Sequence, residues 1–116
     1  MKLKLVAKVD IGSAPHKASE AMSLGIDLAI DDLIQSCKNH DYTYAYSDDR
    51  NQWEKGREEA HRIAKLIKIL VVDFKVDADA LMNRCLEVAP KMRVKEGEVE
   101  GMAHQQIRAW FRGVYN

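Results

Sequence analysis

A chain of 116 residues, 47% of them hydrophobic and 31% charged, has the size and composition of one folded domain that covers residues 1–116. Its 18 Lys and Arg residues balance 18 Asp and Glu residues, and this neutrality excludes the broad basic field of a nonspecific nucleic-acid binder. The start of the chain alternates lysine with apolar residues, which matches neither a signal peptide nor a membrane span. Cys37 and Cys85 form no C-x-x-C pair and lie among apolar residues, so we expect buried, reduced thiols in a cytoplasmic protein, with a disulfide between them as the alternative.

The first half of the chain predicts two strands and a helix. Lysines alternate with apolar residues over 2–9, which predicts a strand with one face in water. Apolar residues then recur every three or four positions between Lys17 and Lys38, which predicts an amphipathic helix. Tyrosines alternate with small residues over 42–46, and this period of two predicts a short strand that can pair with the first.

A long central helix is expected over 48–73, with Ser47 as its N-cap. Its apolar residues, which we call the seam, are spaced three and four apart as in a coiled coil. The seam comprises Trp53, Gly56, Ala60, Ile63, Ile67, Leu70 and Phe74. β-Branched residues are dense enough over 67–76 for a strand, but no turn residue precedes them, so we expect helix to about Asp73. Such a helix would span about 39 Å, so part of the seam is expected to bury itself against a second copy in a homodimer.

The last third predicts a helix, a hairpin and a second helix. Asp77 is the expected N-cap of a helix that ends at Pro90. In residues 92–101 a Glu96-Gly97 turn would form a hairpin. This turn would set Val94 opposite Val99, Lys95 opposite Glu98 and Arg93 opposite Glu100. The final helix has Ile107, Trp110, Phe111 and Val114 on its apolar face and ends near Gly113. The expected fold class is therefore α+β, predominantly helical, with a small antiparallel sheet and one long central helix.

Aromatic residues give the strongest indication of function. Tyr42, Tyr44, Tyr46 and Trp53 place four of the eight aromatic residues within twelve positions. Tyrosine and tryptophan bury a large area at low rotamer cost and keep a polar group, so they are typical of protein interfaces. The alternative is that these tyrosines cover the core of a small sheet. We favour a non-enzymatic protein-binding module that uses these four residues, or else the seam of the central helix, and needs no cofactor.

Nucleic-acid binding is one alternative function. Residues 105–112 resemble the recognition helix of homeodomains, which also carries a Trp-Phe pair with basic neighbours. This resemblance implies nucleic-acid contacts through Arg108 and Arg112. However, Gly113 stands where that family has an asparagine, and the following arginine run is missing. Packing of the Trp-Phe pair in the core is therefore the preferred interpretation.

A metal-dependent enzyme is the second alternative. Glu58 and His61 are three residues apart on one helix, a spacing that lets a carboxylate and an imidazole bind one metal ion. Asp48 and Asp49 could add carboxylate ligands. Only one such motif is present, and its residues lie off the seam, so we prefer a solvated helix face and expect no metal site.

Residues 46–56, Tyr-Ser-Asp-Asp-Arg-Asn-Gln-Trp-Glu-Lys-Gly, are similar to a segment of small uncharacterised proteins of tailed phages and prophages. In those proteins an aromatic residue, Ser-Asp-Asp, a Trp and a Gly recur at similar spacing. The resemblance implies a small phage-encoded protein that binds and redirects a host or phage protein.

Overall fold

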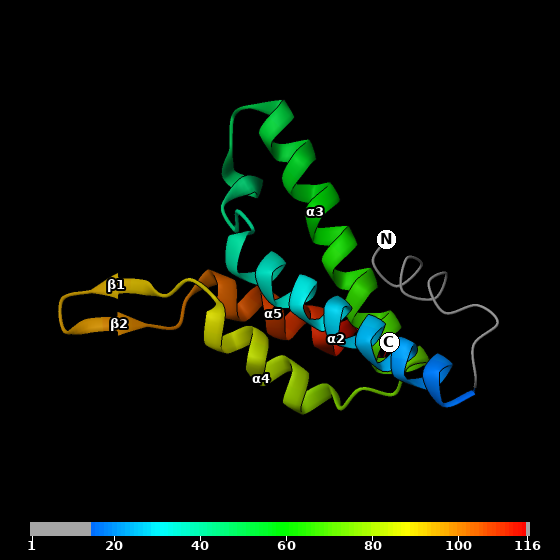
Figure 1. Cartoon of the computed structure of the whole chain (residues 1–116). Helices are drawn as coiled ribbons and strands as arrows, with labels where there is room; N and C mark the ends of the chain where they lie inside the picture. Colours follow the sequence, from blue (N-terminus) through cyan, green and yellow to red (C-terminus); the bar gives the residue numbers. More distant parts are fainter. Residues whose placement is uncertain (1–14, 116) are drawn as a thin grey trace.

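The computed structural model describes residues 15–115, which form four α-helices and one β-hairpin (Figure 1). In chain order the elements are α2 (Pro15–Asn39), the 3₁₀ turn η1 (Tyr44–Tyr46), α3 (Arg50–Lys68), the π-helical turn η2 (Ile69–Asp73), α4 (Ala78–Val88), β1 (Met92–Val94), β2 (Gly97–Val99) and α5 (Met102–Gly113). The prediction of a predominantly helical α+β domain with a small antiparallel sheet is confirmed. The strand expected over 2–9 lies outside the described residues.

The helices expected before and after the central one are confirmed to within a few residues. The predicted cap of α4 forms, because Asp77 Oδ1 accepts a hydrogen bond from the Ala80 N–H at 3.0 Å. This helix ends at Val88, and Ala89 is extended because the following Pro90 disfavours helical geometry in the residue before it.

The central helix is continuous from Arg50 to Asp73, because α3 passes directly into η2. The N-cap is Asp49 and not the predicted Ser47: Asp49 Oδ1 accepts from the Asn51 N–H at 2.9 Å, and the Ser47 hydroxyl accepts from the Asp49 N–H at 3.1 Å. The serine therefore orders the turn that leads into the cap, while the residue next to the first helical position does the capping.

The β-branched end of this helix stays helical, as predicted, but its last turn widens. The Phe74 N–H donates to the Ile69 carbonyl five residues back at 3.1 Å, and the Val76 N–H donates to the Leu70 carbonyl at 3.0 Å. Lys75 lies between them in the left-handed region with φ of 59°. This geometry closes the helix and turns the chain toward α4.

The strand expected over 42–46 is wrong, since these residues form a turn and the short helix η1. Asp41 Oδ1 accepts from both the Thr43 N–H (2.9 Å) and the Thr43 hydroxyl (2.6 Å). The Tyr46 N–H then donates to the Thr43 carbonyl, and the Ser47 N–H donates to the Tyr44 carbonyl. These local bonds use N–H groups that a strand would offer to a neighbouring strand.

The hairpin is present, but its predicted register is wrong. Met92 lies opposite Val99, Arg93 opposite Glu98 and Val94 opposite Gly97, which leaves a two-residue loop of Lys95 and Glu96. A turn centred on Glu96 and Gly97 would favour positive φ at both residues. In the structure the positive φ, 137°, falls on Gly97 alone, and the loop shifts back by one residue.

The core lies where the four helices meet. It consists of Ala29, Leu33, Cys37, Ile63, Leu66, Ile67, Leu70, Leu81, Cys85, Ala89, Ala103, Ile107 and Phe111. The seam from Gly56 to Leu70 is therefore buried within a single chain, which removes the apolar face that was expected to pack against a second copy. Only the first seam residue, Trp53, is substantially exposed.

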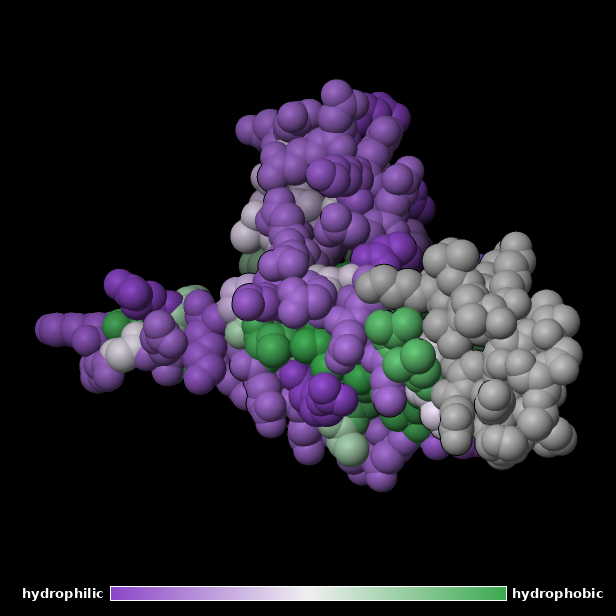
Figure 2. All heavy atoms as spheres, in the orientation of Figure 1, coloured by the Kyte–Doolittle hydropathy of each residue, from purple (hydrophilic) through white to green (hydrophobic). Residues whose placement is uncertain are grey.

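Two features extend from the helical body. One is the hairpin, and the other, which we call the arm, comprises residues 40–57, from the end of α2 to the middle of α3 (Figure 1). The radius of gyration is 16.5 Å, whereas a compact chain of this length has a radius of about 13 Å. On the face shown in Figure 2, hydrophobic residues gather over α2 and α4, and the arm is mostly hydrophilic. The arm therefore contributes little to the main core.

Candidate functional site

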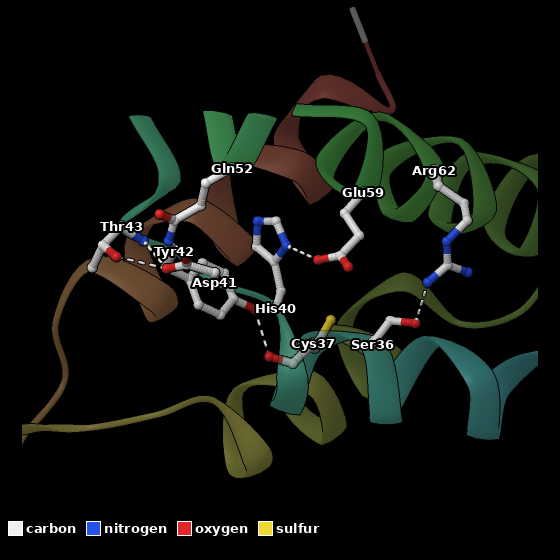
Figure 3. Close-up of polar contacts among 9 residues, drawn as sticks. All are labelled: Ser36, Cys37, His40, Asp41, Tyr42, Thr43, Gln52, Glu59 and Arg62. Carbon is white, nitrogen blue, oxygen red and sulfur yellow. Dashed lines mark hydrogen bonds and ion pairs between the residues drawn. The ribbon is translucent and has the colours of Figure 1, made fainter. Parts of the chain in front are cut away.

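The arm is held in place by a turn whose polar atoms reach the first turn of α3. Asp41 Oδ2 accepts from Gln52 Nε2 at 2.8 Å, while its other carboxylate oxygen binds Thr43 (Figure 3). Gln52 Oε1 in turn accepts from the Ser47 hydroxyl at 2.8 Å. The hydrogen bonds from Thr43 and then Gln52 hold the pKa of Asp41 below its usual value. One glutamine side chain thus ties both ends of the turn to the helix.

His40 is the central side chain at the base of the arm. It is 5% exposed, and its Nδ1–H donates to Glu59 Oε1 on α3 at 2.8 Å (Figure 3). Its ring centroid lies 4.8 Å from that of Tyr42, 5.5 Å from that of Tyr44 and 5.7 Å from that of Trp110. The bond and the three aromatic contacts connect the end of α2 to α3 and α5.

The surroundings of His40 do not equip it for proton transfer to a substrate. Its Nε2 is buried and has no hydrogen-bond partner. On the solvent side, Glu59 lines a polar hollow of about 240 Å³ in which Arg62 Nη2 donates to the Ser36 hydroxyl at 2.6 Å and Nη1 donates to Asp32 at 3.4 Å. Among the described residues the Ser36 hydroxyl hydrogen-bonds to a guanidinium and not to a base that could take its proton, so the hollow shows no activated nucleophile. The geometry of these contacts indicates that they fasten helices together.

The four predicted partner-binding residues divide into two pairs. Tyr42 and Tyr44 point inward: the Tyr42 hydroxyl donates to the Cys37 carbonyl at 2.7 Å, and Tyr44 packs on Gly56. Tyr46 and Trp53 point outward, with 77% and 37% of their surfaces exposed. The Arg57 guanidinium lies 5.6 Å from the centroid of the Trp53 ring, a cation–π contact.

The two arginines of the nucleic-acid alternative lie along α5, but Arg108 already has an anionic partner. Arg108 Nη1 pairs with Glu100 Oε1 at 2.6 Å, and this pair holds the pKa of Glu100 below its usual value. Arg112 is exposed. The apolar face of α5, including Phe111, is buried in the core as the preferred interpretation expected. Of the two arginines, Arg112 alone has no carboxylate partner among the described residues.

The acidic residues of the metal alternative do not converge. Asp49 caps α3, and Glu58 and His61 are exposed on that helix. In residues 15–115, three or more His, Cys, Asp or Glu side chains are nowhere grouped as metal ligands would be. The described helices also include none that is long and apolar enough to cross a membrane.

Sequence reasoning missed the contact of His40 with Glu59 and the contacts of Arg62 with Ser36 and Asp32. The contacts join residues 19 and 26 or more positions apart, and none of them follows a helical spacing. The only sequence signal was a histidine two residues before the first of the alternating tyrosines. Comparison with family models, with curated proteins and with solved structures finds no match to the chain.

Cys37 and Cys85 are free, buried thiols at the contact between α2 and α4. The hydrogen bond with the Cys85 thiol and burial both raise the pKa of Cys37, and burial raises the pKa of the neighbouring Tyr42. Both groups therefore keep their protons in the folded protein at a pH where the unfolded chain has lost them.

Alkaline pH is accordingly expected to destabilise the fold. The contribution of Cys37 is fully present below its unfolded pKa of 9.0 and decreases above it, by about 1.4 kcal/mol per pH unit. Urea titrations of wild-type protein and Cys37→Ala between neutral and alkaline pH measure this. The free energy of unfolding should fall less steeply above pH 9 in the variant. Equal slopes in the two proteins would contradict the assignment.

Proposed function

We propose that this protein is a binding module that contacts another protein through the outward side of its arm. The contact surface, which we call the arm patch, consists of Tyr46, Trp53 and Arg57. The observation that carries the proposal is the exposure of Tyr46 and Trp53 on a segment that the hydrogen bonds of Gln52 and His40 fasten to α3. Tyr, Trp and Arg are the residue types that supply most of the binding energy at protein interfaces.

The arm presents this patch without a large ordering cost. Gln52 binds both Asp41 and Ser47, so the segment that carries Tyr46 is fixed beside the turn of helix that carries Trp53. A partner would not have to order these backbones on binding, and a preorganised surface retains more of its contact energy as affinity.

The resemblance to phage proteins supports a host or phage protein as the partner. It covers residues 46–56, so it includes both aromatic residues of the arm patch and Gly56, which lets Tyr44 pack on α3. We propose that the partner is a host or phage protein in the cytoplasm, and that this module redirects it. A second copy of the chain is the other partner to test, because Tyr46 and Trp53 are exposed even though the seam is buried.

Affinity capture followed by reconstitution tests this proposal. Wild-type protein and the double variant Tyr46→Ala/Trp53→Ala would be used as bait, with Arg50→Ala/Glu54→Ala as the control that alters an exposed ion pair on the same helix. A protein that is lost only with the patch variant would be purified and titrated by calorimetry. We expect at least about tenfold weaker binding to the patch variant and unchanged binding to the control.

Two outcomes would contradict the proposal. One is that no captured protein depends on the patch and light scattering shows a monomer that does not self-associate. The other is that the purified partner binds the patch variant as tightly as wild type. Thermal unfolding of the variants distinguishes a loss of binding from a loss of fold. Both substituted side chains lie on the surface, so the unfolding temperature should change little.

A further inference from the structure

A second surface lies on the other half of α3, where it runs beside α5. The two helices enclose a groove of about 390 Å³, which we call the basic groove. One wall is formed by His61, Lys65 and Lys68 of α3, and the other carries Trp110 of α5 and Val114, the residue that follows α5. The partner-binding and nucleic-acid-binding sites predicted from the sequence include neither wall.

The charge of the basic groove is one-sided, although the whole chain is neutral. Neither an aspartate nor a glutamate lines it. Among the described residues, Arg50, Arg62 and Arg108 each pair with a carboxylate, whereas Lys65 and Lys68 do not. Both lysines are exposed, so two unneutralised ammonium groups border an apolar surface. Such a border attracts a ligand that carries negative charge beside an apolar face.

Small residues line the part of the groove between its two walls. It is formed by Ala64 of α3 and by Ala109 and Gly113, four residues apart on one face of α5. A Cβ atom placed on Gly113 would meet no other atom within 4 Å, so open space lies above the backbone. Small residues let a third helix approach the two helices closely.

Trp110 is suited to anchor an apolar side chain rather than to stack on a base. Its ring packs against His40 at 5.7 Å and Tyr42 at 6.0 Å between centroids, so part of the ring is already covered. Bases of single-stranded nucleic acids need an open aromatic face and a basic track along the backbone. The groove provides a partly covered ring and two lysines, which favours a peptide over a nucleic acid.

We propose that the basic groove binds an acidic amphipathic helix of a partner protein. The apolar side of that helix would lie on Ala109, Gly113 and Trp110, and its carboxylates would face Lys65 and Lys68. The chain's own first ten residues carry three lysines and one aspartate, so their charge does not complement this wall. The basic groove lies on a different half of α3 from the arm patch, so the two surfaces are tested independently.

Fluorescence gives a direct test. The chain has two tryptophans, so Trp53→Phe leaves Trp110 as the only one, beside the groove. The probe is a synthetic amphipathic helical peptide with leucine and alanine on one face and glutamate on the other. We expect a saturable shift of Trp110 emission at micromolar peptide. The affinity should decrease as salt is added, because exposed charges are screened.

Matched variants separate charge from shape. In the Trp53→Phe background, Lys65→Glu/Lys68→Glu should bind the peptide at least about tenfold more weakly. Lys38→Glu/Lys95→Glu, which makes the same change in net charge at exposed sites outside the groove, should bind like the parent. Gly113→Leu should block the groove and abolish the shift while the fold persists, because its side chain enters open space and leucine favours helix.

Three results would overturn the proposal. The first is the absence of a saturable emission change with the acidic peptide. The second is equal binding of a peptide in which glutamine replaces every glutamate, since the lysines would then recognise nothing. The third is tighter binding of a single-stranded oligonucleotide than of the acidic peptide, which would assign the groove to nucleic acid.

Discussion

Replacing Gly56 with alanine is expected to destabilise the protein by about 2 kcal/mol, although alanine is normally the better helix former by about 1 kcal/mol. The new methyl group would overlap Cβ, Cγ and Cδ2 of Tyr44, which packs directly on the helix at this point. Tyr44 cannot simply retreat, because η1 is fixed on one side by His40 and on the other by the bonds around Ser47. The clash therefore separates the arm from α3 or shifts the helix.

Urea titration of three proteins checks this expectation. Gly113→Ala is the matched control, because it makes the same substitution in a helix where nothing lies within 4 Å of the new atom. Because Gly113 is the last residue of α5, this control should be neutral or stabilised by no more than about 1 kcal/mol, the gain in a helix interior. Gly56→Ala should also become neutral or stabilising in a Tyr44→Gly background, where the overlapping atoms are absent. A stabilised Gly56→Ala in the wild-type background would show that Tyr44 does not pack on this helix.

Replacing His40 with alanine is expected to cost about 3 kcal/mol, the larger of the two effects. The substitution leaves a cavity among Tyr42, Tyr44 and Trp110 and removes the bond to Glu59. Glu59 is itself partly exposed and can regain water, so most of the cost comes from lost packing.

His40→Phe separates the two contributions. Phenylalanine restores a ring among the aromatic side chains and eliminates the buried Nε2 that has no partner. We expect it to recover more than half of the loss seen with alanine, measured as free energy of unfolding in urea. If phenylalanine were as destabilising as alanine, the hydrogen bond to Glu59 and not the aromatic packing would fasten the arm.

The helical part of the fold could be predicted because its apolar residues repeat at helical spacing. This pattern kept residues 67–73 in a helix despite their β-branched side chains. The strand prediction over 42–46 was wrong because it rested on a period of two in the sequence. In the structure Asp41 and Thr43 form a local turn that uses the backbone donors. The predicted hairpin register was wrong because it placed Gly97 inside the two-residue loop. In the structure Gly97 has a positive φ and lies directly after the loop.

The candidate site was predictable in composition but not in arrangement. Alternation suggested that Tyr42, Tyr44 and Tyr46 share one side, and a 3₁₀ turn instead sends the first two inward and the third outward. The bond between His40 and Glu59 joins the residue after α2 to α3, and no spacing rule connects them. The basic groove was missed for the same reason, since its walls come from α3 and α5.

The proposed binding surface requires that the arm have a buried side and an exposed side. The most direct measurement is NMR relaxation of the four tyrosine rings by a soluble paramagnetic agent. We expect strong enhancement for Tyr46 and Tyr115, which are 77% and 73% exposed, and weak enhancement for Tyr42 and Tyr44. Equal enhancement of Tyr44 and Tyr46 would contradict the account, because the arm would then have no inward aromatic side to hold the binding surface in place.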